Sequence, residues 1–349
     1  MTARRSRSVT RGSAALLIGG LVAACLAPSA SPVPSGPASP SGPASPSTSA
    51  SPSTSASPST LPSGSQAPTA SPSDVPATSP TRGTSGLPDF PFIWVIVLEN
   101  QDYGRVVGAS DMPFLNELID GSGLAERYSS VARPSQPNYF AMFSGSTHGV
   151  HDNDDHDIDA PTLVDQIEAS GRTWREYAEN RPPNCFDGAV ADGGRDGPGV
   201  YRRKHAPAIS FDAIRNDPAR CANLVDFTAF RPGDADFSLI IPDQCHAAHD
   251  CKAPEADKWL ASFVPTIVES DAFKAGGLLA VTFDEDAGND PSGGHIATVL
   301  ASPQVLSGYR SDVPYDHYSL LRTIDEAWSL GCLAEACTAR TMTDFFDGA

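Results

Sequence analysis

The sequence predicts an α/β fold in which a mostly parallel β-sheet is sandwiched by helices. Apolar runs of strand length alternate with segments of helical spacing through residues 89–349. Polar side chains follow directly after three of these runs, and sheets of this kind bind ligands at the carboxyl ends of their strands. The 261 residues of this region suffice for one domain with a substantial core. We therefore expect a single folded domain over residues 89–349.

The expected elements begin with a strand over residues 92–98, a continuous apolar run. Helical spacing over residues 113–119 follows, with Asp111 as the expected cap. The other expected elements are, in order, a helix at 162–169, a strand at 237–241, a helix at 255–270, strands at 277–283 and 296–301, and a helix at 318–330.

Residues 1–25 have the features of an export signal. Four arginines precede an apolar run from Ala14 to Ala24, which is short for a membrane span. The run leads into Leu21-Val22-Ala23-Ala24-Cys25, which resembles the bacterial lipobox, where the cysteine is lipidated. We predict a lipoprotein-type signal peptide with lipid on Cys25. A plain signal peptide that discards Cys25 is the alternative.

Residues 26–88 are predicted to be a disordered tether. Of the 32 prolines, 15 fall between Pro28 and Pro88, and most other residues there are Ser, Ala, Thr and Gly. Such a stretch cannot bury a core. The domain is therefore expected to be exported, either as a cell-membrane lipoprotein on the extracellular side or as a secreted protein.

The folded region is strongly acidic. Residues 1–88 hold five Arg and one Asp, so residues 89–349 carry 19 basic and 41 acidic residues, a net charge of −22. Such a surface repels phosphate backbones, so nucleic acid is excluded as a partner. The one membrane contact expected is the N-terminal lipid anchor, and a monomer is expected.

Six cysteines remain beyond Cys25, an even number in a protein expected to be exported. Disulfides are therefore expected. Short spacing favours two local bridges and leaves a third pair, which gives Cys245–Cys251, Cys332–Cys337 and Cys185–Cys221. A zinc site is the alternative, which the lack of a CxxC pair disfavours.

Oxygen-bearing side chains follow three of the expected strands. These are Glu99-Asn100, Pro242-Asp243 and Asp284-Glu285-Asp286. One acid after a strand is usually a cap or turn residue. Three such sets at one edge of a sheet indicate a site for a hard divalent cation.

A further motif lies between the first strand and the later ones. Ser135-Gln136-Pro137-Asn138 stands at an expected helix start and is followed by Ser144-Gly145 and His148-Gly149. This order resembles the nucleophile region of the alkaline phosphatase superfamily. Without the acids at the strand ends, an ordinary serine-capped helix would be the simpler interpretation.

Within that superfamily the sequence most resembles the bacterial and fungal phosphoesterase family, which contains acid phosphatases and phospholipases C. The matching segments are Glu99-Asn100, Pro242 to Asp250, Asp284-Glu285 and Tyr315 to Leu321. They extend over most of residues 92–346. The resemblance implies an alkaline-phosphatase-like fold and a phosphoric ester hydrolase.

The resemblance also implies the roles of individual residues. One divalent cation, Ca, Mg, Mn or Zn, would be held by Glu99, Asn100, Ser135, Asp284 and Glu285. A second cation or a phosphate would lie near Asp243, His249 and His317, with His295 as a further candidate. Among the histidines, His317 and His249 rank above His295 and His246. The second cation stays open, because the chain has His246-Ala247 where relatives commonly have Asn-Asp. The other histidines, His148, His151, His156 and His205, are interpreted as structural or surface residues.

The chemistry follows from these residue types. A serine hydroxyl attacks phosphorus only when a base or cation stabilises its alkoxide. With Ser135 at a helix N-terminus, backbone N–H groups and the Asn138 amide are expected to face the developing charge. Attack would give a phosphoserine that water hydrolyses.

Three other functions compete with a phosphomonoesterase that acts on a small phosphate ester. A phospholipase C-type phosphodiesterase is the nearest. A sulfatase would need Arg four residues after the nucleophile, and position 139 is Tyr. A catalytically inactive surface binding lipoprotein would have no reason to keep both the nucleophile and the carboxylates.

Overall fold

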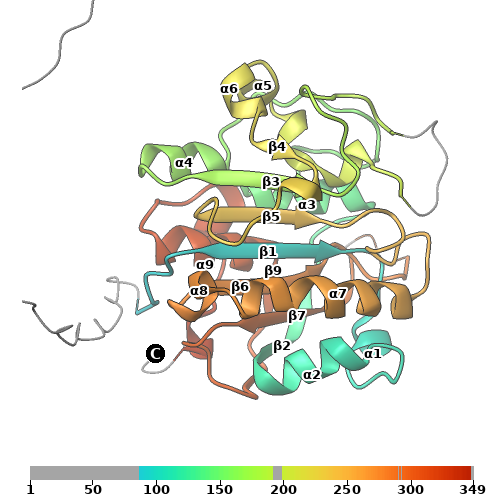
Figure 1. Cartoon of the computed structure of the whole chain (residues 1–349), viewed down its shortest axis with the longest axis vertical. Coiled ribbons are helices and arrows are strands. Elements are labelled where there is room, and N and C mark those ends of the chain that lie inside the picture. Colours follow the sequence, from blue (N-terminus) through green and yellow to red (C-terminus); the bar gives the residue numbers. More distant parts are fainter. Residues whose placement is uncertain (1–85, 192–198, 290, 292, 347–349) are drawn as a thin grey trace, which may run out of the picture. The chain divides into compact units, whose positions relative to one another are not determined.

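A computed structural model describes residues 86–191, 199–289, 291 and 293–346 of the chain. The expected signal peptide, with Cys25, and nearly all of the expected tether lie outside these residues. The described residues form a mostly parallel sheet with helices on both faces, so the predicted fold class is confirmed (Figure 1).

The sheet has nine strands in the order β4-β3-β5-β1-β6-β7-β2-β8, with β9 also paired to β2. Only β7 runs antiparallel to its neighbours β6 and β2 among the described pairs. The segment 284–294 between β6 and β7 is too short for a crossover helix, so the chain reverses there. The strands are β1 (Ile93–Leu98), β2 (Gly123–Ser129), β3 (Trp174–Ala178), β4 (Leu224–Val225), β5 (Phe237–Ile241), β6 (Leu278–Phe283), β7 (His295–Ala301), β8 (Arg310–Ser311) and β9 (Tyr315–Asp316).

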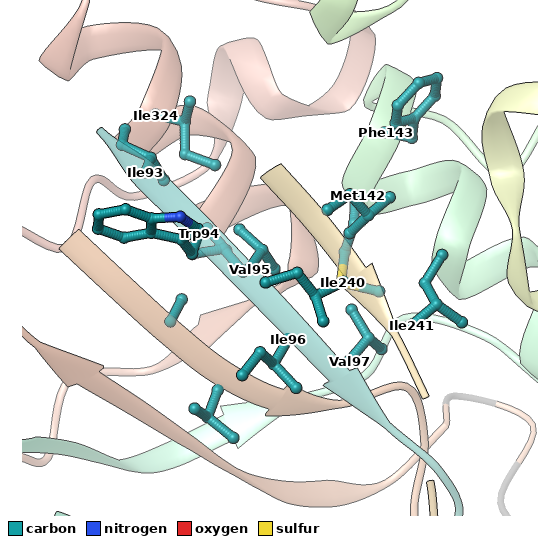
Figure 2. Packing of buried hydrophobic residues seen from close by; sticks show 14 of the residues in the cluster. Ile93, Trp94, Val95, Ile96, Val97, Met142, Phe143, Ile240, Ile241 and Ile324 are labelled. Atoms are coloured by element: carbon teal, nitrogen blue, oxygen red, sulfur yellow. The ribbon is translucent and has the colours of Figure 1, made fainter. Parts of the chain in front are cut away.

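Helices cover both faces of the sheet. On one face, Val95 of β1 lies in the same apolar cluster as Met142 of α3 and Ile324 of α9 (Figure 2). On the other, the Trp94 ring contacts Phe273 of α8. The helices are α1 (Tyr103–Val106), α2 (Pro113–Gly121), α3 (Ser135–Ser144), α4 (Leu163–Ala169), α5 (Asp212–Arg215), α6 (Pro218–Cys221), α7 (Ala253–Val268), α8 (Asp271–Lys274) and α9 (His317–Ala327), and the 3₁₀ turn η1 (Arg203–His205) follows the gap at 192–198.

The start of α2 differs from the prediction. Met112, and not Asp111, is the residue before the helix, and it makes no side-chain cap. The carboxylate of Asp257 on α7 instead accepts hydrogen bonds from the backbone N–H groups of Phe114 and Leu115, at 3.0 and 2.9 Å. The first turn of α2 is thus satisfied by a neighbouring helix.

The three expected disulfides are present, as Cys185–Cys221, Cys245–Cys251 and Cys332–Cys337. Among the described residues, no helix is long and apolar enough to cross a membrane.

Candidate active site

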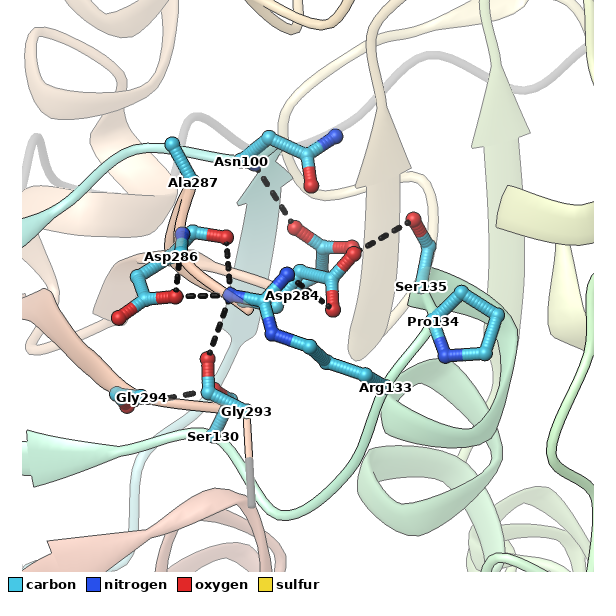
Figure 3. Close-up of polar contacts among 12 residues, drawn as sticks. Asn100, Ser130, Arg133, Pro134, Ser135, Asp284, Asp286, Ala287, Gly293 and Gly294 are labelled. Carbon is cyan, nitrogen blue, oxygen red and sulfur yellow. Dashed lines mark hydrogen bonds and ion pairs between the residues drawn. The ribbon is translucent and has the colours of Figure 1, made fainter. Parts of the chain in front are cut away.

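The site forms where the parallel strands β1 and β6 end side by side. Glu99 follows β1 and Asp284 follows β6, and both side chains are fully buried. Asn100 adopts a positive φ of 50°, which turns the chain so that its backbone N–H donates to Asp284 Oδ1 at 3.1 Å (Figure 3). The pairing of the strands therefore brings these carboxylates together, as the sequence predicted.

Ser135, the first residue of α3, is buried beside these carboxylates. Its hydroxyl lies 3.2 Å from Glu99 Oε2 and 3.4 Å from Glu285 Oε1. Figure 3 shows the hydroxyl directed toward the acids at the end of β6. The expected backbone donors are fewer than predicted, because the Gln136 N–H donates to Asn153 and Pro137 has no N–H.

Arg133 connects the nucleophile loop to the segment after β6 (Figure 3). Its guanidinium donates to Glu285 Oε2 at 3.2 Å, to the carbonyl of Asp286 at 2.6 Å and to the carboxylate of Asp286. It also donates to the carbonyl of Gly293. A Cβ at Gly294, which has a φ of +95°, would overlap the Asp286 carboxylate, so glycine is required there. Arg133 was not among the site residues predicted from the sequence.

Two rings enclose Glu99 from the opposite side. The hydroxyl of Tyr139 donates to Glu99 Oε1, and His205 Nε2 lies 3.2 Å from Glu99 Oε2. The two rings stack with their centroids 5.3 Å apart. Burial holds the pKa of His205 well below its usual range, and the positive charge of Lys204 lowers this pKa further. His205 is thus not a surface residue but a buried neighbour of the carboxylates.

The carboxylates carry more negative charge than the described side chains balance. Burial, followed by repulsion from Asp284, raises the pKa of Glu99 well above its usual value. The same two causes raise the pKa of Glu285 to about 8, and burial raises that of Asp284. Asp284 Oδ2 is buried and accepts no hydrogen bond from the described residues. A divalent cation would remove this imbalance, and carboxylate, amide and hydroxyl oxygens are suitable ligands for it.

The residues proposed for a second site separate into different places. Asp243 lies with Glu179 and His246, while His249 lies with Glu99 and His205. The oxygens of Asp243 accept four hydrogen bonds, two of them from Cys245 N and His246 N at 2.9 Å. Asp243 therefore braces its own loop.

The other two histidines of the proposed set are engaged elsewhere. His317 Nε2 lies 2.7 Å from the carbonyl of Asp284, and its Nδ1 lies 3.3 Å from the Tyr128 hydroxyl. His317 thus links the backbone that follows β6 to the side chain of Tyr128 on β2. His295 Nε2 contacts the carbonyl of Glu126, and its ring stacks on Tyr103.

Asn138 does not face the nucleophile as expected. Its Oδ1 accepts from the backbone N–H groups of Val131 and Ala132, both at 3.0 Å, and its Nδ2 donates to the carbonyls of Ala132 and Pro134. The amide is fully used in shaping the loop that leads to Ser135. The structure makes it a positioning residue, which corrects the predicted contact with the developing charge.

His249 has a cation beside it. Lys204 Nζ lies 3.1 Å from His249 Nε2, and His249 Nδ1 lies 2.5 Å from Asp250 Oδ1. Lys204 can only donate, so His249 Nε2 is the acceptor in this contact. The ammonium group of Lys204 thus occupies the side of His249 Nε2 on which a second metal ion would have to bind.

The sequence profile of the Phosphoesterase family matches residues 106–331. A probable acid phosphatase of Kluyveromyces lactis is 31% identical over 69% of this chain and 59% of the relative, and a phosphatidylinositol-3-phosphatase of Mycobacterium tuberculosis is 29% identical over 75% and 85%. The chain spans about three fifths of the length of the fungal acid phosphatases that it matches.

Solved structures support the fold. An alkaline phosphatase superfamily protein from Vibrio parahaemolyticus superposes with a TM-score of 0.51 at 13% identity, covering 78% of this chain and 74% of that one. A phosphonate monoester hydrolase from Silicibacter pomeroyi gives 0.50 at 14% identity, covering 74% and 76%. At such identities the likeness concerns the architecture alone.

Proposed function

Because the chain belongs to the phosphoesterase family, as its motifs predicted, we propose that it is a metal-dependent hydrolase of phosphate monoesters in which Ser135 is the nucleophile. The observation that carries the proposal is the position of the Ser135 hydroxyl, 3.2 and 3.4 Å from two buried carboxylates at the end of the sheet. The relatives named acid phosphatase support the reaction class.

Glu99, Asn100, Ser135, Asp284 and Glu285 would hold one divalent cation. When bound, the cation supplies positive charge that lowers the pKa of the serine hydroxyl and stabilises negative charge on the phosphoryl oxygens. The buried and unsatisfied oxygen of Asp284 fits this role. We propose a single cation, since Lys204 already contacts His249 Nε2.

The protein groups then act on the proton and the phosphoryl group. The Ser135 Oγ proton passes to Glu99 Oε2, the nearest base, as Oγ bonds to phosphorus and the ester oxygen leaves with its bonding electrons. Water next attacks the phosphoserine, which releases inorganic phosphate and returns a proton to Oγ. Arg133 and Lys204 supply positive charge on two sides of the carboxylates.

We further propose that the substrate is a phosphomonoester presented outside the cytoplasm, with the domain anchored through lipid on Cys25 and the tether. The relative named phosphatidylinositol-3-phosphatase also acts, by its name, on a phosphomonoester. A phospholipase C-type activity is the second candidate, supported by a match to a non-specific phospholipase C1 of Arabidopsis thaliana over 51% of this chain.

A substrate panel on the full chain tests these assignments. It compares p-nitrophenyl phosphate, its bis-p-nitrophenyl diester, phosphatidylinositol 3-phosphate and phosphatidylcholine, with and without exhaustive chelation. We expect monoester turnover that chelation abolishes and added divalent cation restores. Diester turnover exceeding monoester turnover would favour the phospholipase alternative.

A pair of serine variants tests the nucleophile. Ser135→Ala is expected to lose most of the monoester turnover and to keep its fold. Ser144→Ala is the matched control, because Ser144 is a buried serine on the same helix whose hydroxyl bonds the Phe140 carbonyl. Equal turnover in the two variants would remove Ser135 from the mechanism.

A further inference from the structure

An open cleft of about 730 Å³ adjoins the carboxylate cluster. It includes Asn100, whose backbone binds Asp284, and His249, whose ring centroid lies 5.6 Å from that of His205. Its lining also includes Cys251 to Pro254, at the start of α7. A group attached to phosphorus at Ser135 therefore has space beside the site.

The lining of this cleft is polar. Its larger side chains are those of Asn100, Gln101, Arg105, His249 and Lys252, and its apolar members are alanines, one proline and the disulfide-bonded Cys251. None of the described residues that line it is Leu, Ile, Val, Met, Phe, Tyr or Trp. An acyl chain would find little apolar surface there, so the cleft suits a small polar group.

The sequence contains four lysines, and two of them lie at the site or in the lining of this cleft. Lys258 pairs with Glu255 at 2.8 Å and Lys274 donates to the Glu269 carbonyl. Lys204 lies beside His249 at the site, and Lys252 lines the cleft. Neither lysine forms an ion pair with a described carboxylate.

The exposed side chain of Lys252 makes no hydrogen bond or ion pair with a described residue, and its backbone carbonyl accepts from Glu255 N at 2.9 Å. In a region of net charge −22, acids are plentiful as partners, so an uncompensated cation at this position indicates an anionic ligand. Arg105, which also lines the cleft, pairs with Asp102 at 3.2 Å but has a side chain that is 73% exposed, so it is also available to a ligand. Among the described residues of the lining, Asp111 alone carries a carboxylate.

We propose that this cleft binds the leaving group of the substrate, and that Lys252, assisted by Arg105, binds a second phosphate group on it. The preferred substrates are then small, polar bisphosphates with one phosphoryl group at Ser135 and the other in the cleft. This inference rests on the proposed function and adds the substrate class to it. The polar lining argues against a lipid leaving group in the same place.

The test uses fructose 1,6-bisphosphate and fructose 6-phosphate, which differ by one phosphate group. For the full chain with divalent cation, we expect a higher kcat/KM with the bisphosphate. Lys252→Met should lower the ratio of the two kcat/KM values about tenfold, because one charge-assisted contact is lost. Lys252→Arg should restore most of the ratio, and Lys258→Met, which removes a paired lysine of α7, should keep it.

A binding measurement separates this inference from the proposed function. In the Ser135→Ala background, calorimetry of fructose 1,6-bisphosphate with and without Lys252→Met reports the subsite without turnover. A loss of affinity of about tenfold supports the subsite even if hydrolysis is slow. Equal affinities, or an unchanged kcat/KM ratio in an active Lys252→Met enzyme, overturn the subsite and leave the proposed hydrolysis standing. An enzyme that neither binds nor hydrolyses either sugar phosphate overturns the inference as well.

Discussion

Asp325 in α9 offers a quantitative test of the electrostatics in this fold. Its side chain is fully buried, and neither carboxylate oxygen accepts a hydrogen bond from a described residue. Burial raises the pKa of Asp325 from 3.8 to about 7, although the charge of Arg322, one turn earlier, acts in the opposite direction. The folded chain therefore keeps a proton on Asp325 that the unfolded chain releases at much lower pH.

The sign and size of the effect follow by linkage. A carboxyl group whose pKa is raised by folding contributes its full stability below the unfolded pKa, and loses that contribution as pH rises through the folded pKa. Between about pH 4 and pH 8, ionisation of Asp325 should lower the free energy of unfolding by about 4 kcal/mol at 1.36 kcal/mol per pKa unit. Asp325→Asn removes this ionisation and should be more stable than the wild type at pH 8, with little difference near pH 4.

Urea unfolding of the full chain in the presence of chelator measures this difference. Glu285 also has a raised pKa and contributes to the pH dependence of both proteins. The measurement therefore compares the free energy of unfolding of the mutant with that of the wild type at each pH. Asp120→Asn is the control, since its carboxylate is 79% exposed and should not alter the pH profile. Parallel pH profiles for Asp325→Asn and wild type would refute the assignment of an unpartnered, buried carboxyl group.

Three further predictions concern the site. Glu99→Gln and Asp284→Asn should each weaken divalent cation binding at least tenfold in calorimetric titration while the chelated protein keeps or gains stability, since a buried charge is removed; unchanged affinity in both would disprove the cation site. Arg133→Lys keeps the charge but cannot reach Glu285 and Asp286 together, so steady-state kinetics should show kcat reduced about tenfold with KM little changed, and an unaltered kcat would mean that Arg133 does not position the loop. Asn138→Ala should lower the free energy of unfolding by about 2 to 4 kcal/mol in thermal denaturation, because the four hydrogen bonds of a buried side chain are lost; a change under about 1 kcal/mol would contradict its bracing role.

The strands that the sequence revealed are those buried on both faces. β1, β5 and β6 are apolar at nearly every position because helices cover the sheet on each side. β2 and β3 were missed because charged residues interrupt them. Glu176 of β3, for example, is buried and accepts a hydrogen bond from the backbone of Ala208, a tertiary contact that no local pattern reports.

The same distinction applies to the site. Glu99, Asp284 and Glu285 could be predicted because parallel strands end at the same edge of a sheet. Arg133 stands two residues before Ser135, so its nearness in sequence was a signal that could have identified it. His205 and Lys204 had no such signal, because neither stands next to a strand, helix or motif that the sequence predicted. The roles of the signal peptide, the tether and Cys25 stay predictions.

Trapping of the covalent intermediate tests the central claim most directly. The full chain would be mixed with p-nitrophenyl phosphate and divalent cation, quenched in acid during turnover, digested and analysed by mass spectrometry. We predict that the peptide containing Ser135 carries one phosphoryl group, that Ser135→Ala carries none, and that Ser144→Ala is labelled as the wild type is. An active enzyme whose Ser135 peptide is never phosphorylated, on a time scale that resolves single turnovers, would contradict the account.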